Sequence, residues 1–594
     1  MSENGGIKFE KNMATFIGIL MLVLFLPVLF CVICIGSKMN YWEMMKPISV
    51  MSNLKLLIFL IPLFAVGIGI LIISEKIEIS EAWQKRIPWF FAVFAVGLYF
   101  LSDYICREIA FRIPWDVMVV RGAALELAKG KKLGNMSYFS MYTNNIPITY
   151  ILWKMLEWIK EFHFKYNQEY IWLRVNCVMM SAAVYFSAMT TWKVTKNLGA
   201  AILTFLSGVA LIGLSGWKIA PYTDTYGMLP TVLCIYFYVS FKQGKKIAWR
   251  IVCLVATAFF GVLAWFIKPN LAIVLIAVFC AELIHSLSDL KKYRKEILIF
   301  AVCILACLVG FTAYKKSLPK KMGLELTENV EAGLAEFFYM GLNEERTGCY
   351  NDADLTVYGE FENAPRSERE KEVFNRAMKR LEEKGVAGGI GFALRKLTMT
   401  FNEGTFGWTN EVEIESHYLP IVSDNSKMMD YLRSFYWNGP RRPKYATFAQ
   451  GAWVLVLMGI PWTAIAFLPV AAALISDRKD ILQKEKALQA ELRKHMANKE
   501  ISENETADSE AQKNFENELK RKRDIEGTSL LAFLICFVGI VLYQLLFEAR
   551  ARYLFAFLPV IISMSIIGMW EVSFLASAAY KKLLGMRKKD GSRE

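Results

Sequence analysis

The sequence PWDVMVVRGAALELAKG (114–130), followed after a polar gap by YFSMYTNNIPITYIL (138–152), decides how this chain is interpreted. Asp116 stands just beyond an apolar run and opens a stretch with the periodicity of an amphipathic helix. A second amphipathic helix is predicted after Asn144, Asn145 and Pro147. Neither stretch is typical of a membrane span, although spans are predicted on both sides. We therefore expect an acidic side chain at the edge of a bilayer, where lipid meets water.

The composition predicts an all-α polytopic membrane protein. Of the 594 residues, 55% are hydrophobic and 14% are aromatic, which would leave a soluble domain with far too much exposed apolar surface. Nearly uncharged runs recur that are long enough to cross a hydrocarbon core of about 30 Å, and a spanning helix satisfies its own backbone hydrogen bonds. We predict twelve transmembrane helices, at residues 13–36, 54–74, 88–102, 170–191, 198–216, 225–241, 251–267, 269–285, 297–314, 451–475, 528–547 and 553–571.

The basic residues predict the orientation of these spans. The net charge is +14, and the lysines and arginines gather in short loops (242–250 and 291–295) and in the tail, as cytoplasmic anchors do. The charge is thus no sign of a nucleic-acid partner, and both termini are predicted to be cytoplasmic. The stretch 146–160 is predicted to lie on the membrane, because Lys154 and Glu157 interrupt it. Five connections are then predicted to be outside: 103–169, 217–224, 268–270, 315–450 and 548–552.

These assignments divide the chain into six parts. Residues 1–87 hold two N-terminal spans, and residues 88–314 hold a core of spans with the first outer loop at 103–169. Residues 315–450 are predicted to form a small outer soluble domain, which a span at 451–475 follows. Residues 476–527 form a charged cytoplasmic loop, best interpreted as a solvated linker. Residues 528–594 hold the last pair of spans and the basic tail.

Two acids on the predicted outer side are candidates for chemistry. Ionisable residues are nearly absent from the spans, and exceptions such as Glu282 and Glu571 lie close to span ends, where side chains can reach solvent. Asp116 and Asp224, in PYTDTYG (221–227), each precede a predicted helix, and either could be a simple N-cap. Alternatively they share one site, with one carboxylate acting as general base on a hydroxyl and the other positioning it.

Three cations are predicted on the same side. Lys268 lies in the turn of WFIKPNL (265–271), and Arg550 and Arg552 lie in LLFEARARYLF (545–555). Two arginines in a short outer turn run against the usual charge bias, and their planar donors would suit a lipid-linked phosphate. Anchoring to lipid headgroups is the alternative.

The sequence gives little sign of a metal centre. Cys31 and Cys34 have a CxxC spacing but lie in an apolar run, where cysteine behaves as a small hydrophobic residue, and there is no HExxH, so a zinc site held by cysteine and histidine is not expected. Asp352 and Asp354 in YNDADL (350–355) resemble the Asp-x-Asp of metal-dependent, nucleotide-sugar glycosyltransferases, but they are predicted to lie outside the cell, where nucleotide sugars are not supplied. We expect no required cofactor; a divalent metal is compatible with the sequence but not indicated.

Taken together, these motifs resemble the GT-C glycosyltransferases of the protein-mannosyltransferase and aminoarabinose-transferase type (glycosyltransferase family 39-like). The first motif of that family, D-x(3)-Y-x(3)-A-x(2)-L-x(2)-G, is matched by Asp116, Ala124, Leu127 and Gly130, with Val120 in place of tyrosine. Residues 143–147 resemble its proline-rich turn, Asp224 its second acid, and residues 548–554 its EARxRYL element. Two additional N-terminal spans and the segment 315–450 depart from the pattern.

The resemblance implies a GT-C fold with two outer juxtamembrane helices, in a bacterial cytoplasmic membrane. It implies transfer of a sugar from a polyprenyl-phosphate donor to a hydroxyl of a cell-envelope glycan, lipid or protein, by direct inverting displacement on the extracytoplasmic face. Asp116 and Asp224 would be catalytic, and Lys268, Arg550 and Arg552 would bind the donor phosphate. Tyr142, Asn144, Asn145 and Tyr222 are the expected substrate-binding residues. A lipid-linked glycan flippase or exporter, or a non-catalytic protein of the same fold, is the alternative.

Overall fold

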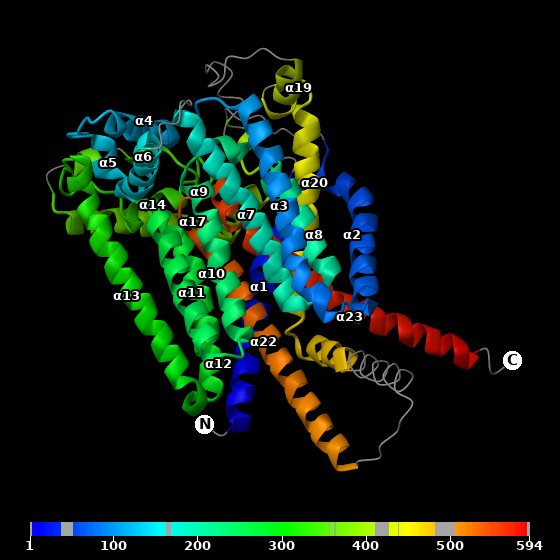
Figure 1. Ribbon diagram of the computed structural model, residues 1–594. Helices are drawn as coiled ribbons and strands as arrows, with labels where there is room; N and C mark the ends of the chain where they lie inside the picture. The colour runs from blue at the N-terminus through cyan, green and yellow to red at the C-terminus, as the bar shows by residue number, and fades with distance from the viewer. Residues whose placement is uncertain are drawn as a thin grey trace.

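The computed structural model describes residues 3–36, 51–161, 168–355, 357–361, 364–409, 411, 427–437, 439–480 and 505–590. In these ranges the ordered elements are helices, and the single β-bridge, between Gly134 and Leu324, is isolated. The predicted all-α class is therefore confirmed for the part of the chain that the structure describes (Figure 1).

Ten helices in the described ranges are long and apolar enough to cross a membrane. They coincide with ten of the twelve predicted spans. These helices are α1 (Glu3–Cys34), α2 (Asn53–Lys76), α3 (Glu81–Ile109), α7 (Gln168–Thr195), α11 (Ile247–Ile267), α12 (Ala272–Ser288), α13 (Leu290–Met322), α20 (Arg442–Ile465), α22 (Glu505–Leu546) and α23 (Leu558–Asp590).

The other two predicted spans form shorter helices, so the predicted number of twelve is corrected to ten of full length. The run 198–216 forms α8 (Leu198–Gly208), which widens into the π-turn η3 (Val209–Gly213). Gly208 packs so closely on Val184 that an added Cβ would lie 2.8 Å from that side chain. The run 225–241 forms α10 (Met228–Gln243), whose 16 residues span about 24 Å, short of a core of about 30 Å. Hydropathy shows how long an apolar run is, but it does not show where within that run a helix ends.

Short helices gather at one end of the bundle, which we call the upper end because it is uppermost in Figure 1. Helices α4 (Asp116–Ala128) and α6 (Ile146–Glu161) pack against each other there, with α5 (Ser137–Met141) and η2 (Thr143–Asn145) between them in sequence. The two amphipathic helices predicted at 116–130 and 146–160 are therefore present, and they lie across the ends of the long helices (Figure 1).

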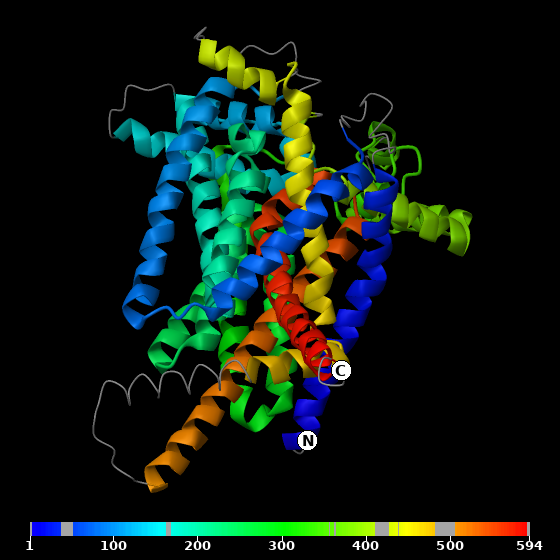
Figure 2. The ribbon, with the colours of Figure 1, turned by 90° about the vertical axis from the view of Figure 1, so that its right-hand side faces the viewer.

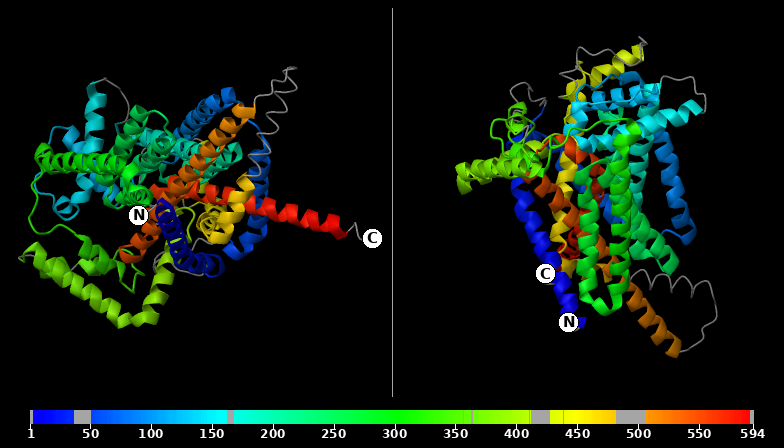
Figure 3. Two further views of the ribbon diagram at one scale, coloured as in Figure 1. Left: turned by 90° about the horizontal axis from the view of Figure 1, so that it is seen from below. Right: turned by 90° about the vertical axis from the view of Figure 1, so that its left-hand side faces the viewer.

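The segment 315–450 also lies at the upper end. Its described helices are α14 (Leu334–Gly341), α15 (Asp352–Leu355), α16 (Val357–Glu360), α17 (Arg366–Phe401) and α19 (Lys427–Tyr436). Helix α17 turns at Gly385, whose φ of 60° suits glycine, and it projects from the side of the bundle (Figures 2 and 3). After the side of the membrane on which the sequence predicts them, we call residues 334–401 the outer segment. Residues 481–504 of the predicted charged loop are outside the described residues.

Both ends of the chain lie toward the opposite, lower end (Figures 1 and 3). The two acids expected to reach solvent there are instead buried and paired. Glu282 accepts hydrogen bonds from Lys242 and Tyr238, both at 3.0 Å, and Glu571 accepts one from Lys479 at 2.9 Å. A paired carboxylate can be buried at lower cost than a single one, so these acids join helices rather than reach the headgroups.

Candidate functional site

Asp116 is the first residue of α4, and its direction is set by the residue before it. Trp115 occupies the N-cap position with a left-handed φ of 58°, and its side chain makes no capping hydrogen bond. Its indole Nε1 donates to Glu411 at 2.8 Å, and its ring meets Tyr222 edge-on with centroids 5.6 Å apart. The N-cap interpretation of Asp116 is therefore wrong, because Trp115 holds the cap position.

The Asp116 carboxylate is held by two tyrosine hydroxyls. Tyr138 on α5 donates to Oδ1 at 2.8 Å, and Tyr222 lies 3.2 Å from Oδ2. The Asn145 amide donates to the Tyr138 hydroxyl at 2.6 Å, and its Oδ1 lies 3.0 Å from the Tyr222 hydroxyl. We call these four residues the tyrosine cradle. Each carboxylate oxygen has two acceptor directions, so a substrate hydroxyl can bind Asp116 while the tyrosines hold it.

Both cradle tyrosines are protonated donors at neutral pH. Burial raises the pKa of Tyr138 and of Tyr222, and the charge of Asp116 raises both further. Tyr142 packs on Tyr138 with ring centroids 5.2 Å apart, and burial and the Asp116 charge raise its pKa to about 12. Asn144 donates to the Asn145 side chain at 3.5 Å. The predicted residues Tyr142, Asn144, Asn145 and Tyr222 thus gather around Asp116.

Asp224 lies in a separate, buried cluster. It is in α9 (Thr223–Tyr226), where Tyr222 holds the N-cap position, so the cap interpretation of Asp224 is also wrong. Lys268 donates to its Oδ1, and the Nε of Arg552 lies 3.5 Å from its Oδ2. Burial lowers the pKa of Lys268, and the Arg552 charge adds to that effect while Asp224 opposes it. Two cations on one carboxylate leave a net charge of +1, so Asp224 is a counter-ion.

Aromatic rings surround the Arg552 guanidinium. Its Cζ lies 4.1 Å from the centroid of Trp115, 5.7 Å from those of Trp217 and Tyr553, and 6.0 Å from that of Tyr222. Such faces attract a cation. Within the described ranges, its buried Nε and Nη1 have no hydrogen-bond partner. Arg552 therefore retains donor capacity beside Asp224.

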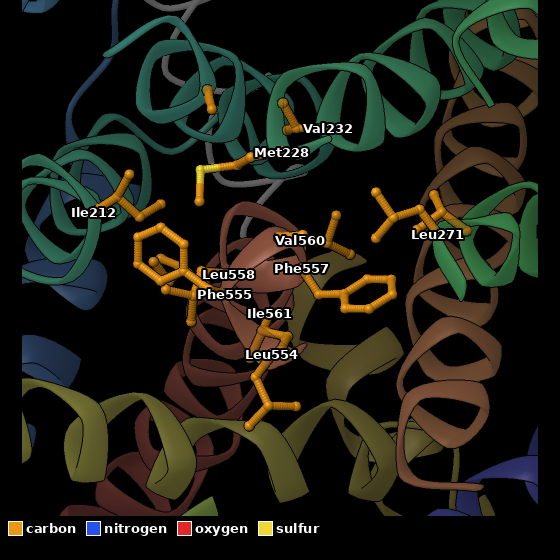
Figure 4. Close-up of a cluster of buried hydrophobic side chains, with 14 of the residues drawn as sticks. Ile212, Met228, Val232, Leu271, Leu554, Phe555, Phe557, Leu558, Val560 and Ile561 are labelled. Atoms are coloured by element: carbon orange, nitrogen blue, oxygen red, sulfur yellow. The ribbon is translucent and has the colours of Figure 1, made fainter. Parts of the chain in front are cut away.

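A dense apolar core holds the arginine turn. Arg552 lies in η6 (Ala551–Phe557), and Leu554, Phe555 and Phe557 of that element have no exposed surface. Figure 4 shows Phe555 near Ile212 of η3 and Met228 of α10, and Phe557 near Leu271 of η5 (Pro269–Leu271). Because the core is closely packed, the position of Arg552 is fixed by η6 and not by its own flexible side chain.

Arg550 belongs to a second, more accessible layer. It forms an ion pair with Glu548 at 3.3 Å, and its side chain is 24% exposed, whereas that of Arg552 is 9% exposed. Asp116 and Tyr142 are also partly exposed. The predicted site is therefore split into an open layer, with Asp116, Tyr142 and Arg550, and the buried cluster of Asp224, Lys268 and Arg552. Tyr222 links the two layers, because its hydroxyl donates to Asp116 and its ring lies beside the Arg552 guanidinium.

The outer segment grips the turn that carries both arginines. The Lys396 ammonium is fully buried and donates to Gly341 O at 2.6 Å, Leu545 O at 2.9 Å and Phe547 O at 2.7 Å. These carbonyls lie at the C-terminal ends of α14 and α22, where a cation is favourable. Gly348 O accepts from the Ala549 amide at 2.9 Å. The sequence did not predict this clamp, because one lysine among the many charged residues of α17 has no distinguishing pattern.

Other features of the site were also missed. Tyr138 was not predicted, because it lies in α5 and Asn145 in η2, and only the bend between these two elements brings their side chains together. The pairing of Trp115 with Glu411 joins residues 296 positions apart, and no sequence pattern marks it.

The described ranges contain no group of three or more His, Cys, Asp or Glu side chains that could hold a metal ion. Asp354 instead binds Arg380 at 2.7 Å and Asn343 at 2.8 Å, so it has a structural role. Asp352 accepts a hydrogen bond from the Tyr350 hydroxyl at 2.8 Å. The two acids of YNDADL therefore face different partners.

Comparison with known proteins gives one family. A family model described as conserved hypothetical integral membrane protein matches residues 9–467, which is 459 of the 594 residues. No curated protein and no solved structure matches the chain. The match agrees with the ten apolar helices and covers the tyrosine cradle, Asp224 and Lys268.

Proposed function

We propose that this chain, which belongs to the family of conserved hypothetical integral membrane proteins, is a membrane glycosyltransferase. In this proposal a sugar moves from a polyprenyl-phosphate donor to a hydroxyl of a cell-envelope glycan, lipid or protein, on the extracytoplasmic face of a bacterial cytoplasmic membrane. One observation carries the proposal: the Asp116 carboxylate, oriented by Tyr138 and Tyr222, lies beside a cluster of buried cations at the bundle end. No metal takes part in the proposed reaction.

Asp116 is the general base of the proposed reaction. The acceptor hydroxyl binds to a remaining acceptor direction of the carboxylate and transfers its proton there as its oxygen attacks C1 of the sugar. The new bond from acceptor oxygen to C1 forms as the bond from C1 to the phosphate oxygen breaks, so polyprenyl phosphate leaves. The tyrosine cradle supports this step, because an oriented base does not have to search for its proton.

The cations stabilise the leaving group. Charge grows on the phosphate oxygens as the bond to C1 breaks, and fixed donors aimed at that position lower the barrier. Arg550 in the open layer contacts the phosphate first, and Arg552 and Lys268 add positive potential from behind. Asp224 holds those two cations in place and takes no proton, which refines the catalytic role that its position in the sequence indicated.

The proposal is tested with the purified protein in lipid nanodiscs. Decaprenyl-phosphate-linked mannose, glucose and arabinose are each supplied with a membrane extract as acceptor, and released decaprenyl phosphate is measured. We expect turnover of one donor, and we expect Asp116→Asn to lower it at least about 100-fold, the usual contribution of a general base.

Asp103→Asn is the matched control. Asp103 on α3 also accepts a hydrogen bond from a tyrosine, Tyr170 at 3.3 Å, and pairs with Arg174 at 3.4 Å, but it lies outside the proposed site. We expect this variant to keep wild-type turnover. Turnover by Asp116→Asn equal to the control would exclude the base. If no donor is used while a fluorescent lipid-linked glycan crosses the vesicle membrane, the chain is an exporter and the enzyme proposal fails.

A further inference from the structure

The loop Gly348–Cys349–Tyr350 of the outer segment is fastened to the arginine turn. Gly348 O accepts from the Ala549 amide at 2.9 Å, and the Cys349 thiol donates to Ala549 O at 3.1 Å. An added Cβ at Gly348 would lie 2.6 Å from the Lys396 side chain, and φ is 75°, so only glycine fits this approach. The residue that follows, Tyr350, is therefore held at a fixed place beside Arg550.

Tyr350 contacts the proposed phosphate-binding cation on one side and Tyr142, which packs on Tyr138 of the tyrosine cradle, on the other. The Arg550 guanidinium is 5.8 Å from its ring centroid. Its hydroxyl donates to Asp352 Oδ1 at 2.8 Å. Burial and this hydrogen bond raise the pKa of Tyr350, and the negative charges of Asp352 and Asp116 raise it further. Tyr350 is half-buried and Asp352 is exposed, so both remain accessible to a ligand.

The order of these groups matches the order of atoms in an in-line displacement. The acceptor oxygen is at the base, the phosphate is at the cations, and C1 of the transferred sugar lies between them. A side chain between Asp116 and Arg550 therefore faces the transferred sugar. An aromatic ring beside a carboxylate suits that ligand, because the ring packs on C–H groups and the carboxylate accepts from sugar hydroxyls.

We propose that Tyr350 and Asp352 form the subsite that binds the transferred sugar of the donor. The inference rests on the proposed glycosyltransferase function and adds that the outer segment recognises the sugar, apart from the phosphate and the lipid. Tyr350 packs on the sugar ring, and the Asp352 carboxylate accepts hydrogen bonds from its hydroxyls.

A binding experiment separates the sugar from the phosphate. The full chain carrying Asp116→Asn, which prevents turnover, is titrated in nanodiscs with decaprenyl phosphate and with decaprenyl-phosphate-linked mannose, glucose and arabinose, and tryptophan fluorescence reports binding. We expect Asp352→Ala and Tyr350→Ala each to weaken binding of the preferred sugar-linked lipid at least about tenfold. Binding of decaprenyl phosphate, which has no sugar, is expected to stay within about twofold.

Tyr431→Ala and Asp430→Ala are the matched controls. Both residues are on α19, also at the upper end, and Tyr431 likewise packs under an arginine, Arg441 at 4.8 Å. We expect both variants to bind every lipid like the parent. An equal loss for decaprenyl phosphate and the sugar-linked lipid, or no loss for either, would overturn the subsite while leaving the proposed function intact. Failure of the parent to bind any of these lipids would instead refute the proposed function, and the subsite with it.

Discussion

Replacing Lys396 with methionine tests whether the outer segment holds the arginine turn. Methionine has a similar length and fits an apolar environment but donates no hydrogen bond. The change leaves three buried carbonyls, those of Gly341, Leu545 and Phe547, without their donor. At about 1 kcal/mol for each unmade hydrogen bond, we expect a loss of about 3 kcal/mol in the free energy of unfolding.

The matched control is Lys218→Met. Lys218 lies in η4 (Gly216–Ile219), is also fully buried, and its ammonium donates to one carbonyl, Gly213 O at 2.8 Å. The loss of one hydrogen bond predicts a decrease of about 1 kcal/mol. Because both side chains are buried to the same extent, the difference in stability loss between the two variants measures the contribution of the two additional hydrogen bonds to carbonyls that Lys396 makes.

Two measurements check this prediction. Unfolding by SDS titration in mixed micelles at pH 6, below the Lys396 pKa of about 7, keeps all three N–H donors of the ammonium, and tryptophan fluorescence gives the two stabilities. Hydrogen exchange gives the location: the Glu548 and Ala549 amides, which donate to Phe337 O and Gly348 O, should exchange faster in Lys396→Met and at the wild-type rate in Lys218→Met. Equal stability losses in the two variants, or unchanged exchange at both amides, would refute the clamp.

Three further predictions follow from the site. Tyr222→Phe removes one hydroxyl from the Asp116 carboxylate, and we expect turnover to fall about tenfold and stability by about 1 kcal/mol. Tyr226→Phe in α9, the helix that follows Tyr222, removes a hydroxyl that bonds Trp172 O and should leave turnover unchanged. Arg552→Met leaves Asp224 with Lys268 alone, and we expect the affinity for decaprenyl phosphate to fall about tenfold or more; an unchanged affinity would exclude a phosphate role. Burial lowers the pKa of Lys396 from 10.5 to about 7, so above pH 7 the unfolded chain binds more protons than the folded one. The stability contribution of Lys396 therefore rises between about pH 7 and 10, and Lys396→Met should flatten that rise in SDS titrations at pH 6, 8 and 9.

Most of the bundle could be predicted because a hydrocarbon core imposes a minimum apolar length, which is visible in sequence. Of the two exceptions, α10 is enclosed by other helices, so its apolar run reflects the core of the bundle and not the width of a membrane. Helix α8 keeps Ile202 and Leu206 exposed, and it is short because the chain widens into the π-turn η3. Buried pairs such as Glu282 with Lys242 were not predicted, because the two residues are 40 positions apart and only the fold brings them together.

The candidate site was predicted in part for a similar reason. Asp116 and Asn145 lie in the neighbouring stretches 114–130 and 138–152, and the structure joins them through Tyr138. The role of Asp224 depends on Lys268 and Arg552, which lie 44 and 328 residues away, so its sequence could mark it as an outer acid but could not identify it as a counter-ion. Ion pairs between distant segments form only when the chain packs, so the sequence alone does not predict them.

The most direct test of the central claim is a density map of the wild-type protein in nanodiscs with a decaprenyl-phosphate-linked sugar. The account predicts that the lipid phosphate lies within about 4 Å of Arg550 or Arg552, the usual reach of an ion pair, with the sugar directed toward Asp116. A phosphate bound at the lower end of the bundle, or a sugar directed away from the tyrosine cradle, would contradict the account.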